Sequence, residues 1–193
     1  MLNCPLPDRR LAEPLEDLVP DHVIRPATPE DAAAIATVHV GSWQAAYAGL
    51  LPDAFLSALS IEKRTHFWSS SLADPSRPHT VLTASSGDGI TGFAVFGPSR
   101  DDDATPKTGE LSSIYLLPSA WGQGLGRALH EECVRRLTPQ YETVTLWVLS
   151  TNTRARKFYE RAGWVTDGKT KVETMSDGAV TLEEVRYRLA LEG

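Results

Sequence analysis

Long apolar runs are missing from this sequence of 193 residues, and so is an excess of basic residues. No apolar stretch approaches the ~20 residues of a membrane-spanning helix, and the N-terminal residues contain no apolar h-region, so we expect neither a membrane protein nor a signal peptide. Lysine and arginine total 19 against 25 aspartates and glutamates, which gives a net charge of −6. Because phosphate neutralisation needs a basic surface, this balance argues against nucleic acid as the main partner.

Cysteine is scarce as well. Cys4 and Cys133 are too few for a disulfide framework, and a reducing cytoplasm is therefore the expected location. The length and the 41% hydrophobic content predict one domain with a sizeable core, which we place at residues 22–193. Residues 1–21 are rich in proline and charge without any sustained period, and they predict a flexible N-terminal extension.

The most informative stretch is residues 110–127. Its first part, 111–117, is apolar and typical of a buried strand, which Pro118 ends. Three glycines then alternate within residues 122–126 and lead into an amphipathic helix expected at 125–137. A glycine-rich turn at a helix N-terminus presents free backbone N–H groups and the positive end of the helix dipole, which together favour a bound pyrophosphate. The alternative is a tight strand-to-helix connection without a ligand.

Two common nucleotide-binding motifs do not fit this turn. A P-loop needs Lys and then Ser or Thr after its last glycine, whereas Arg127 and Ala128 follow Gly126. A dinucleotide fingerprint needs G-x-G-x-x-G after the first strand of a βαβ unit, whereas this G-x-G-x-G lies past the middle of the chain.

The turn does resemble another loop. Leu116-Leu117-Pro118 and residues 121–126 (WGQGLG) are similar to the acetyl-CoA loop, Gln/Arg-x-x-Gly-x-Gly/Ala, of the GCN5-related N-acetyltransferase (GNAT) superfamily. Trp121 departs from the pattern, which puts one side-chain contact to phosphate in doubt. Residues 152–164 (NTRARKFYERAGW) match the family's N-x-x-A-x-x-F-Y-x-x-x-G-F/W signature along its length. The resemblance covers roughly residues 23–191.

The resemblance implies a mixed α/β fold with a central twisted, mostly antiparallel sheet flanked by helices. It also implies an acetyl-CoA-dependent N-acetyltransferase without a metal, in which a primary amine attacks the thioester directly in a ternary complex. The expected acceptor is a small molecule of the polyamine, amino acid or aminated antibiotic class. A protein or peptide N-acetyltransferase and a non-catalytic acyl-CoA-binding module are the alternatives. Dimers are common for the fold, but nothing in the sequence demands one.

The family pattern further implies how acetyl-CoA is held. The central strand is expected to splay from its neighbour near Leu116, which would free backbone groups for the pantetheine arm. Asn152 matches the residue that bonds this arm, although it could instead cap a helix. Arg127, Arg154 and Arg156 are candidates for the outer phosphate, or else surface charges. The predicted cofactor-binding residues are Ile114, Tyr115, Leu116, Gly122, Gln123, Gly124, Leu125, Gly126, Arg127, Asn152, Arg156 and Tyr159.

Two residues are the predicted catalytic groups. Tyr159 matches the family's tyrosine beside the sulfur, and a phenol with a pKa near 10 is protonated at pH 7 and can donate to a departing thiolate. Its alternative is packing beside Phe158. Glu110 begins the central strand, where many family members carry a glutamate that acts as base. Its alternative is a strand-edge charge that faces solvent.

The acceptor site is predicted from an aromatic segment, residues 42–52 (SWQAAYAGLLP), which resembles the acceptor wall of one GNAT subgroup. Trp43, Tyr47, Glu110 and Tyr115 are therefore the predicted acceptor-binding residues. For the three aromatic side chains, packing of the first helix and the core is the alternative. His39 shares the apolar stripe of that helix, and we interpret it as a core residue rather than a catalytic one.

Overall fold

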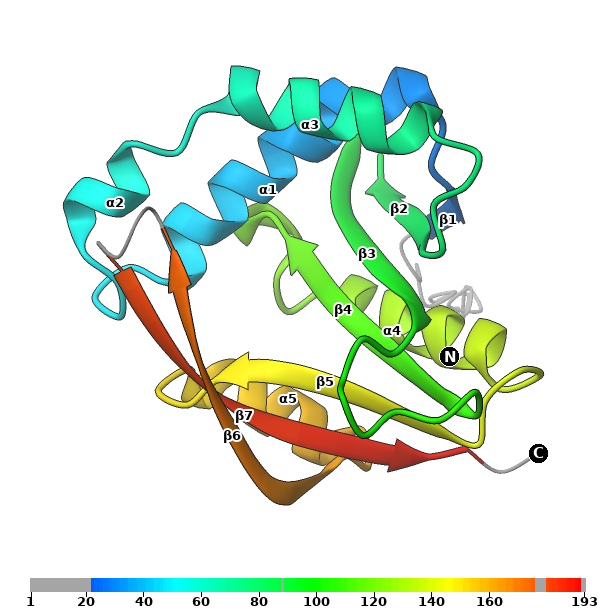
Figure 1. Cartoon of the computed structure of the whole chain (residues 1–193). Coiled ribbons are helices and arrows are strands. Elements are labelled where there is room, and N and C mark those ends of the chain that lie inside the picture. Colours follow the sequence, from blue (N-terminus) through cyan, green and yellow to red (C-terminus); the bar gives the residue numbers. More distant parts are fainter. Residues whose placement is uncertain (1–21, 88, 176–179, 192–193) are drawn as a thin grey trace, which may run out of the picture.

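One seven-stranded sheet is the framework of the computed structural model, which describes residues 22–87, 89–175 and 180–191 (Figure 1). The strand order is β1-β2-β3-β4-β5-β7-β6, and only β4 and β5 run parallel. The strands are β1 (His22–Pro26), β2 (Thr80–Ser86), β3 (Ile90–Pro98), β4 (Thr108–Leu116), β5 (Thr143–Leu149), β6 (Val165–Met175) and β7 (Val180–Ala190).

Helices cover both faces of the sheet, with α1 and α3 on one face and α4 and α5 on the other (Figure 1). The α-helices are α1 (Ala32–Ala46), α2 (Asp53–Ser57), α3 (Ile61–Ala73), α4 (Leu125–Leu137) and α5 (Thr153–Arg161), and the short 3₁₀ helices are η1 (Pro29–Asp31) and η2 (Pro118–Ala120). The mixed α/β architecture expected from the sequence is confirmed. None of the helices in the described ranges is long and apolar enough to cross a membrane.

The apolar stripe of α1 faces the core as predicted. Ile35, His39 and Trp43 are all buried, and burial lowers the pKa of His39 to about 3, so its imidazole is neutral at physiological pH. The 3₁₀ turn η1 directly precedes this α-helix, which therefore begins at Ala32. The Thr28 backbone N–H donates to the Asp31 carboxylate at 2.8 Å and so fixes that turn.

The loop between β3 and β4 carries three consecutive aspartates, residues 101–103, and it is held against the sheet by a buried arginine. The Arg186 guanidinium of β7 is only 2% exposed, and it pairs with Asp101 at 3.1 Å and Asp103 at 2.6 Å. Asp167 of β6 adds a third carboxylate at 2.6 Å. A buried guanidinium needs such partners to offset its lost hydration. These aspartates therefore fasten the loop to β6 and β7 rather than attract a cationic acceptor.

Two long antiparallel strands close the C-terminal end of the sheet. β6 is one strand that runs from Val165 to Met175, and it pairs with β7. Its pairing with β7 shifts register between Thr166 and Thr170, so the intervening residues bulge out without ending the strand. The N-terminal extension predicted at residues 1–21 lies outside the described residues.

Candidate active site

The site begins where β4 and β5 separate. Their parallel pairing covers only Thr108, Gly109 and Glu110 of β4, after which the two strands diverge. The splay implied by the family resemblance is therefore present, but it starts six residues before Leu116. The pairing of β4 with β3 also shifts register around Ser112, whose hydroxyl is buried without a partner among the described residues. This arrangement leaves polar groups of β4 unpaired beside the gap.

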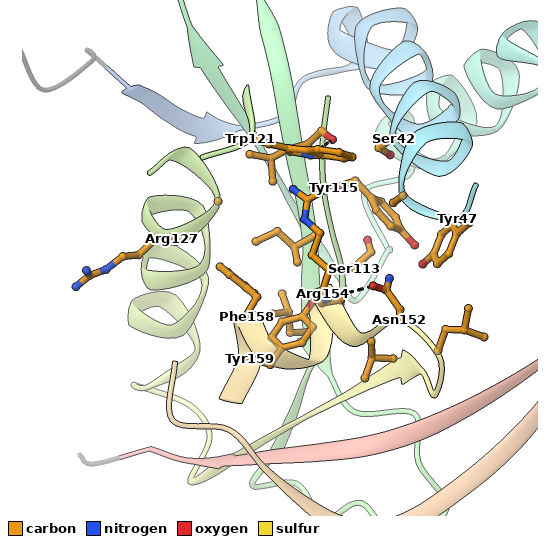
Figure 2. Close-up of a pocket in the computed structure, with 18 of the residues that line it drawn as sticks. Ser42, Tyr47, Ser113, Tyr115, Trp121, Arg127, Asn152, Arg154, Phe158 and Tyr159 are labelled. Carbon is orange, nitrogen blue, oxygen red and sulfur yellow. Dashed lines mark hydrogen bonds between the residues drawn. The ribbon is translucent and has the colours of Figure 1, made fainter. Parts of the chain in front are cut away.

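A cavity of about 420 Å³ fills the gap between the separated strands. The second half of β4 and the end of β5 form two of its walls, and α1, α5 and the N-terminus of α4 contribute the others (Figure 2). It is lined from both faces of the sheet, since Gly126 and Phe158 come from the α4–α5 side and Tyr47 from the α1 side. A ligand in this cavity would pass through the sheet.

The glycine-rich turn forms one end of the cavity, as predicted. Gly122 and Gly124 have φ values of +75° and +83°, which glycine adopts without strain. Gly124 is the N-cap of α4, and no side chain caps that helix. The first backbone N–H groups of α4 thus have no intrahelical partner and face an open cradle. Its geometry and positive dipole fit a pyrophosphate.

Most of the predicted cofactor residues meet at this cavity, but four positions behave differently. The Gln123 side chain donates to the Ser119 carbonyl at 2.6 Å, and the Leu125 side chain is buried in the core. Arg127 lines the cavity, but its guanidinium points away from it and pairs with Glu131 at 2.7 Å (Figure 2). Arg156 donates to the Tyr187 hydroxyl at 3.0 Å and to the Ser150 carbonyl at 3.1 Å. Direct roles for these four side chains stay predictions.

Tyr159 lies in the cavity wall at the α5 side, beside Phe158 (Figure 2). It is only 8% exposed, and burial raises the pKa of its phenol well above the ordinary value. The hydroxyl is therefore protonated over the whole physiological range. Asn152 caps α5 by accepting a hydrogen bond from the Ala155 N–H at 3.1 Å, and it also lines the cavity. Its two alternative roles are thus compatible.

The opposite end of the cavity is aromatic and carries one carboxylate. Tyr47 of α1 and Tyr115 of β4 line it as predicted, whereas Trp43 packs behind them with its ring centroid 5.1 Å from that of Tyr47. The carboxylate belongs to Glu184 of β7, which lies 3.1 Å from the Lys171 ammonium. Burial is the main reason that the pKa of Glu184 is raised above its ordinary value of 4.5.

Glu110 occupies a different environment from the one expected of an accessible base. It is 4% exposed, and both of its carboxylate oxygens accept hydrogen bonds from Arg100, at 3.0 Å for the Nε contact. Its side chain is not part of the cavity wall described above. The alternative of a solvent-facing charge does not hold either, because the carboxylate is buried. The role of Glu110 as base stays a prediction.

Sequence reasoning missed Glu184, although a signal was present. In a strand, alternate residues share one face, so a buried Leu182 places Glu184 and Arg186 on the same inward face. A largely buried carboxylate beside aromatic rings is uncommon, and such groups gather at functional sites, which makes Glu184 a candidate site residue.

The family model described as the acetyltransferase (GNAT) family matches residues 43–164. The chain belongs to this family. It is thus a GNAT N-acetyltransferase, and curated relatives agree with the assignment. "Uncharacterized N-acetyltransferase YuaI" of Bacillus subtilis is 32% identical over 130 residues, covering 67% of this chain and 72% of that protein. "Probable N-acetyltransferase Rv2775" of Mycobacterium tuberculosis is 28% identical over 178 residues, covering 86% and 92%.

Solved GNAT structures share the fold. The paiA N-acetyltransferase of Thermoplasma acidophilum, solved in complex with coenzyme A, superimposes with a TM-score of 0.64 at 19% identity and covers 88% of this chain and 99% of its own. At that identity the likeness establishes the architecture alone. Residue roles in this GNAT enzyme have to rest on its own geometry.

Proposed function

We propose that this GNAT enzyme transfers an acetyl group from acetyl-CoA to a primary amine of a small molecule, by direct attack in a ternary complex. The observation that supports it is the single cavity through the separated strands, with a phosphate cradle at one end and a carboxylate among aromatic rings at the other. Holding both reactants in one cavity would make the transfer effectively unimolecular.

Different groups in the cavity would orient the thioester, protonate the leaving sulfur and deprotonate the amine. Bound acetyl-CoA supplies a thioester, and the free backbone groups of β4 beyond Glu110 are available to orient its carbonyl. The acceptor ammonium first loses one proton to water, which frees the nitrogen lone pair. The lone pair attacks the thioester carbonyl carbon, so that the new C–N bond forms and the C–S bond breaks. Tyr159 donates its phenolic proton to the leaving sulfur and regains a proton from solvent, and a carboxylate on the acceptor side takes the second proton from the nitrogen.

The acceptor end favours a small amine that carries an apolar body. Tyr47 and Tyr115 offer ring faces and edges, and Glu184 offers a negative charge for an ammonium group. These side chains come from three different elements, α1, β4 and β7, so an acceptor between them would be contacted from three sides. Such a recess suits a small molecule better than a folded protein.

A product assay tests this proposal. The purified protein is incubated with acetyl-CoA and one candidate acceptor: a monoamine, a polyamine, an amino acid, an aminoglycoside or a peptide. Free thiol is measured over time, and the products are identified by mass spectrometry. We expect thiol release matched mole for mole by an acetylated small amine. Acetylation of the peptide alone would contradict the small-molecule acceptor. Thiol release without any acetylated amine, or binding without release, would contradict amine transfer.

Glu184→Gln is expected to raise the KM for the amine about tenfold or more, while the dissociation constant for acetyl-CoA stays the same. The reason is that the amide keeps the shape but cannot pair with an ammonium. In the unmodified enzyme kcat/KM should rise with pH as Glu184 ionises. Because its pKa is raised, that rise should be centred above pH 4.5. Other charged or titratable groups near the Glu184 carboxylate also shape the pH profile of kcat/KM. They are Lys171, Glu173, Glu110, Tyr47 and Tyr115.

Glu110→Gln is the matched comparison, since it makes the same change in a carboxylate that Arg100 already holds. The quantity to compare is the rise of kcat/KM with pH on the acid side of the profile. If this rise is lost in the Glu110 variant and unchanged in the Glu184 variant, Glu110 is the proton acceptor and Glu184 is not part of the amine site.

A further inference from the structure

Trp121 occupies the loop position where the family pattern has Gln or Arg, and the structure shows what the indole does there. Its Nε1–H donates to the carbonyl of Leu116, the last residue of β4, at 3.0 Å. This bond fixes the plane of the ring beside the glycine cradle. The guanidinium carbon of Arg154 lies 3.5 Å from the ring centroid, so the cation sits against the face of the indole (Figure 2).

The stack joins two separate parts of the site. Trp121 lies in the connection between β4 and α4, whereas Arg154 is the second residue of α5. Both side chains line the same cavity as Gly122, Gly124 and Gly126. A guanidinium held on an indole therefore stands at the rim of the proposed phosphate cradle.

Stacking leaves the guanidinium chemically available. A cation–π contact takes up none of the guanidinium N–H donors as hydrogen bonds to the ring edge, so these donors can still bind an anion. The Arg154 side chain makes no hydrogen bond or ion pair with any residue in the described ranges. The other two arginines considered from the sequence are engaged, because Arg127 pairs with Glu131 and Arg156 bonds Tyr187 and Ser150.

We propose that Arg154, positioned by the Trp121 indole, is the phosphate-binding cation of this enzyme and replaces the Gln or Arg that the loop lacks. Its in-plane N–H donors would bind phosphate oxygens of acetyl-CoA next to the backbone N–H groups of α4. Planar guanidinium groups bind phosphate through two parallel hydrogen bonds, which fixes orientation as well as affinity. The inference rests on the proposed acetyl-CoA site and adds the residue that recognises its phosphates.

Binding measurements with two probes test this inference without any turnover. Acetyl-CoA carries the phosphates, and S-acetylpantetheine carries the same thioester arm without them. We expect Arg154→Met to weaken acetyl-CoA binding about tenfold to hundredfold in calorimetry, and to leave S-acetylpantetheine binding unchanged. Lys157→Met removes an exposed cation from the same helix and should change neither affinity.

A double-mutant cycle tests whether the Trp121 indole positions Arg154. Trp121→Ala should also weaken acetyl-CoA binding, and adding Arg154→Met to it should cost little more, since the two residues act as one unit. Melting temperatures without ligand verify that the variants are folded. Fully additive losses would show that the indole does not position Arg154.

Several outcomes would overturn the assignment of Arg154. Equal weakening of both probes would make its effect structural, and an equal loss in the Lys157 variant would make it a general charge effect. Unchanged acetyl-CoA binding by Arg154→Met would also reject it, while leaving the acetyl-CoA site intact. Failure of the unmodified protein to bind acetyl-CoA would instead reject the proposed function itself.

Discussion

Tyr159→Phe is expected to lower kcat about a hundredfold and to leave acetyl-CoA affinity within about twofold. The phenol lines the cavity at the α5 side, and its burial keeps the proton on the oxygen. Phenylalanine preserves the ring and its contacts with Phe158 and Trp164, so packing should survive. Only the proton donor to the leaving thiolate is lost. Steady-state kinetics with saturating acetyl-CoA, combined with calorimetry, measure the two effects separately.

The pH dependence gives this prediction a second readout. A general acid works in its protonated form, and because burial raises the pKa of Tyr159, kcat should show no alkaline decline from this group below about pH 10. Tyr141→Phe, which changes a tyrosine outside the cavity, is the control and should behave like the unmodified enzyme. An unchanged kcat in the Tyr159 variant would show that another group, or water, protonates the sulfur.

Local sequence was enough to predict the cradle and Tyr159. A glycine turn directly before an amphipathic helix dictates free N–H groups at that helix end, whatever the rest of the chain does. The signature of residues 152–164 likewise lies within one helix and its flanks, so the positions of Asn152 and Tyr159 relative to each other follow from helical geometry.

Contacts between distant segments could not be predicted in this way. Arg186 meets Asp103 across 83 positions, and Arg154 reaches Trp121 from another element. Such pairs depend on how strands are ordered and where they separate. The run from Leu111 to Leu117 looks equally apolar whether or not it pairs with β5, so the sequence did not reveal that the pairing ends at Glu110. Nor could it reveal that Arg100 holds the Glu110 carboxylate.

Gly126→Leu is expected to abolish measurable acetyl-CoA binding, with a dissociation constant raised at least about a hundredfold, while the fold without ligand stays intact. A Cβ at this position would lie 3.6 Å from Leu116 and 4.0 Å from Phe158, which both line the cavity. Those are ordinary van der Waals distances, so the backbone need not move. The remaining atoms of a leucine would then extend between β4 and α5, into the space proposed for the cofactor arm.

A substitution at position 126 can block the ligand without straining the backbone, unlike a substitution at the other two glycines of the turn. Gly122 and Gly124 have positive φ values, so any substitution there would strain the chain and confuse the result. Gly126 is the second residue of α4 and carries no such constraint. Replacing a helical glycine also removes a flexible residue, which stabilises a helix by up to about 1 kcal/mol relative to glycine.

Thermal unfolding with and without acetyl-CoA shows whether a leucine at position 126 prevents acetyl-CoA from binding. At a hundredfold excess over the dissociation constant, binding stabilises the native state by about 2.7 kcal/mol, which amounts to several degrees of melting temperature. The unmodified protein and Gly126→Ala should both show this shift, because one methyl group fits the space. Gly126→Leu should melt at the same temperature with or without ligand. A full shift in the leucine variant would mean that acetyl-CoA does not enter between β4 and α5, and the cradle at the N-terminus of α4 would then be only a tight connection.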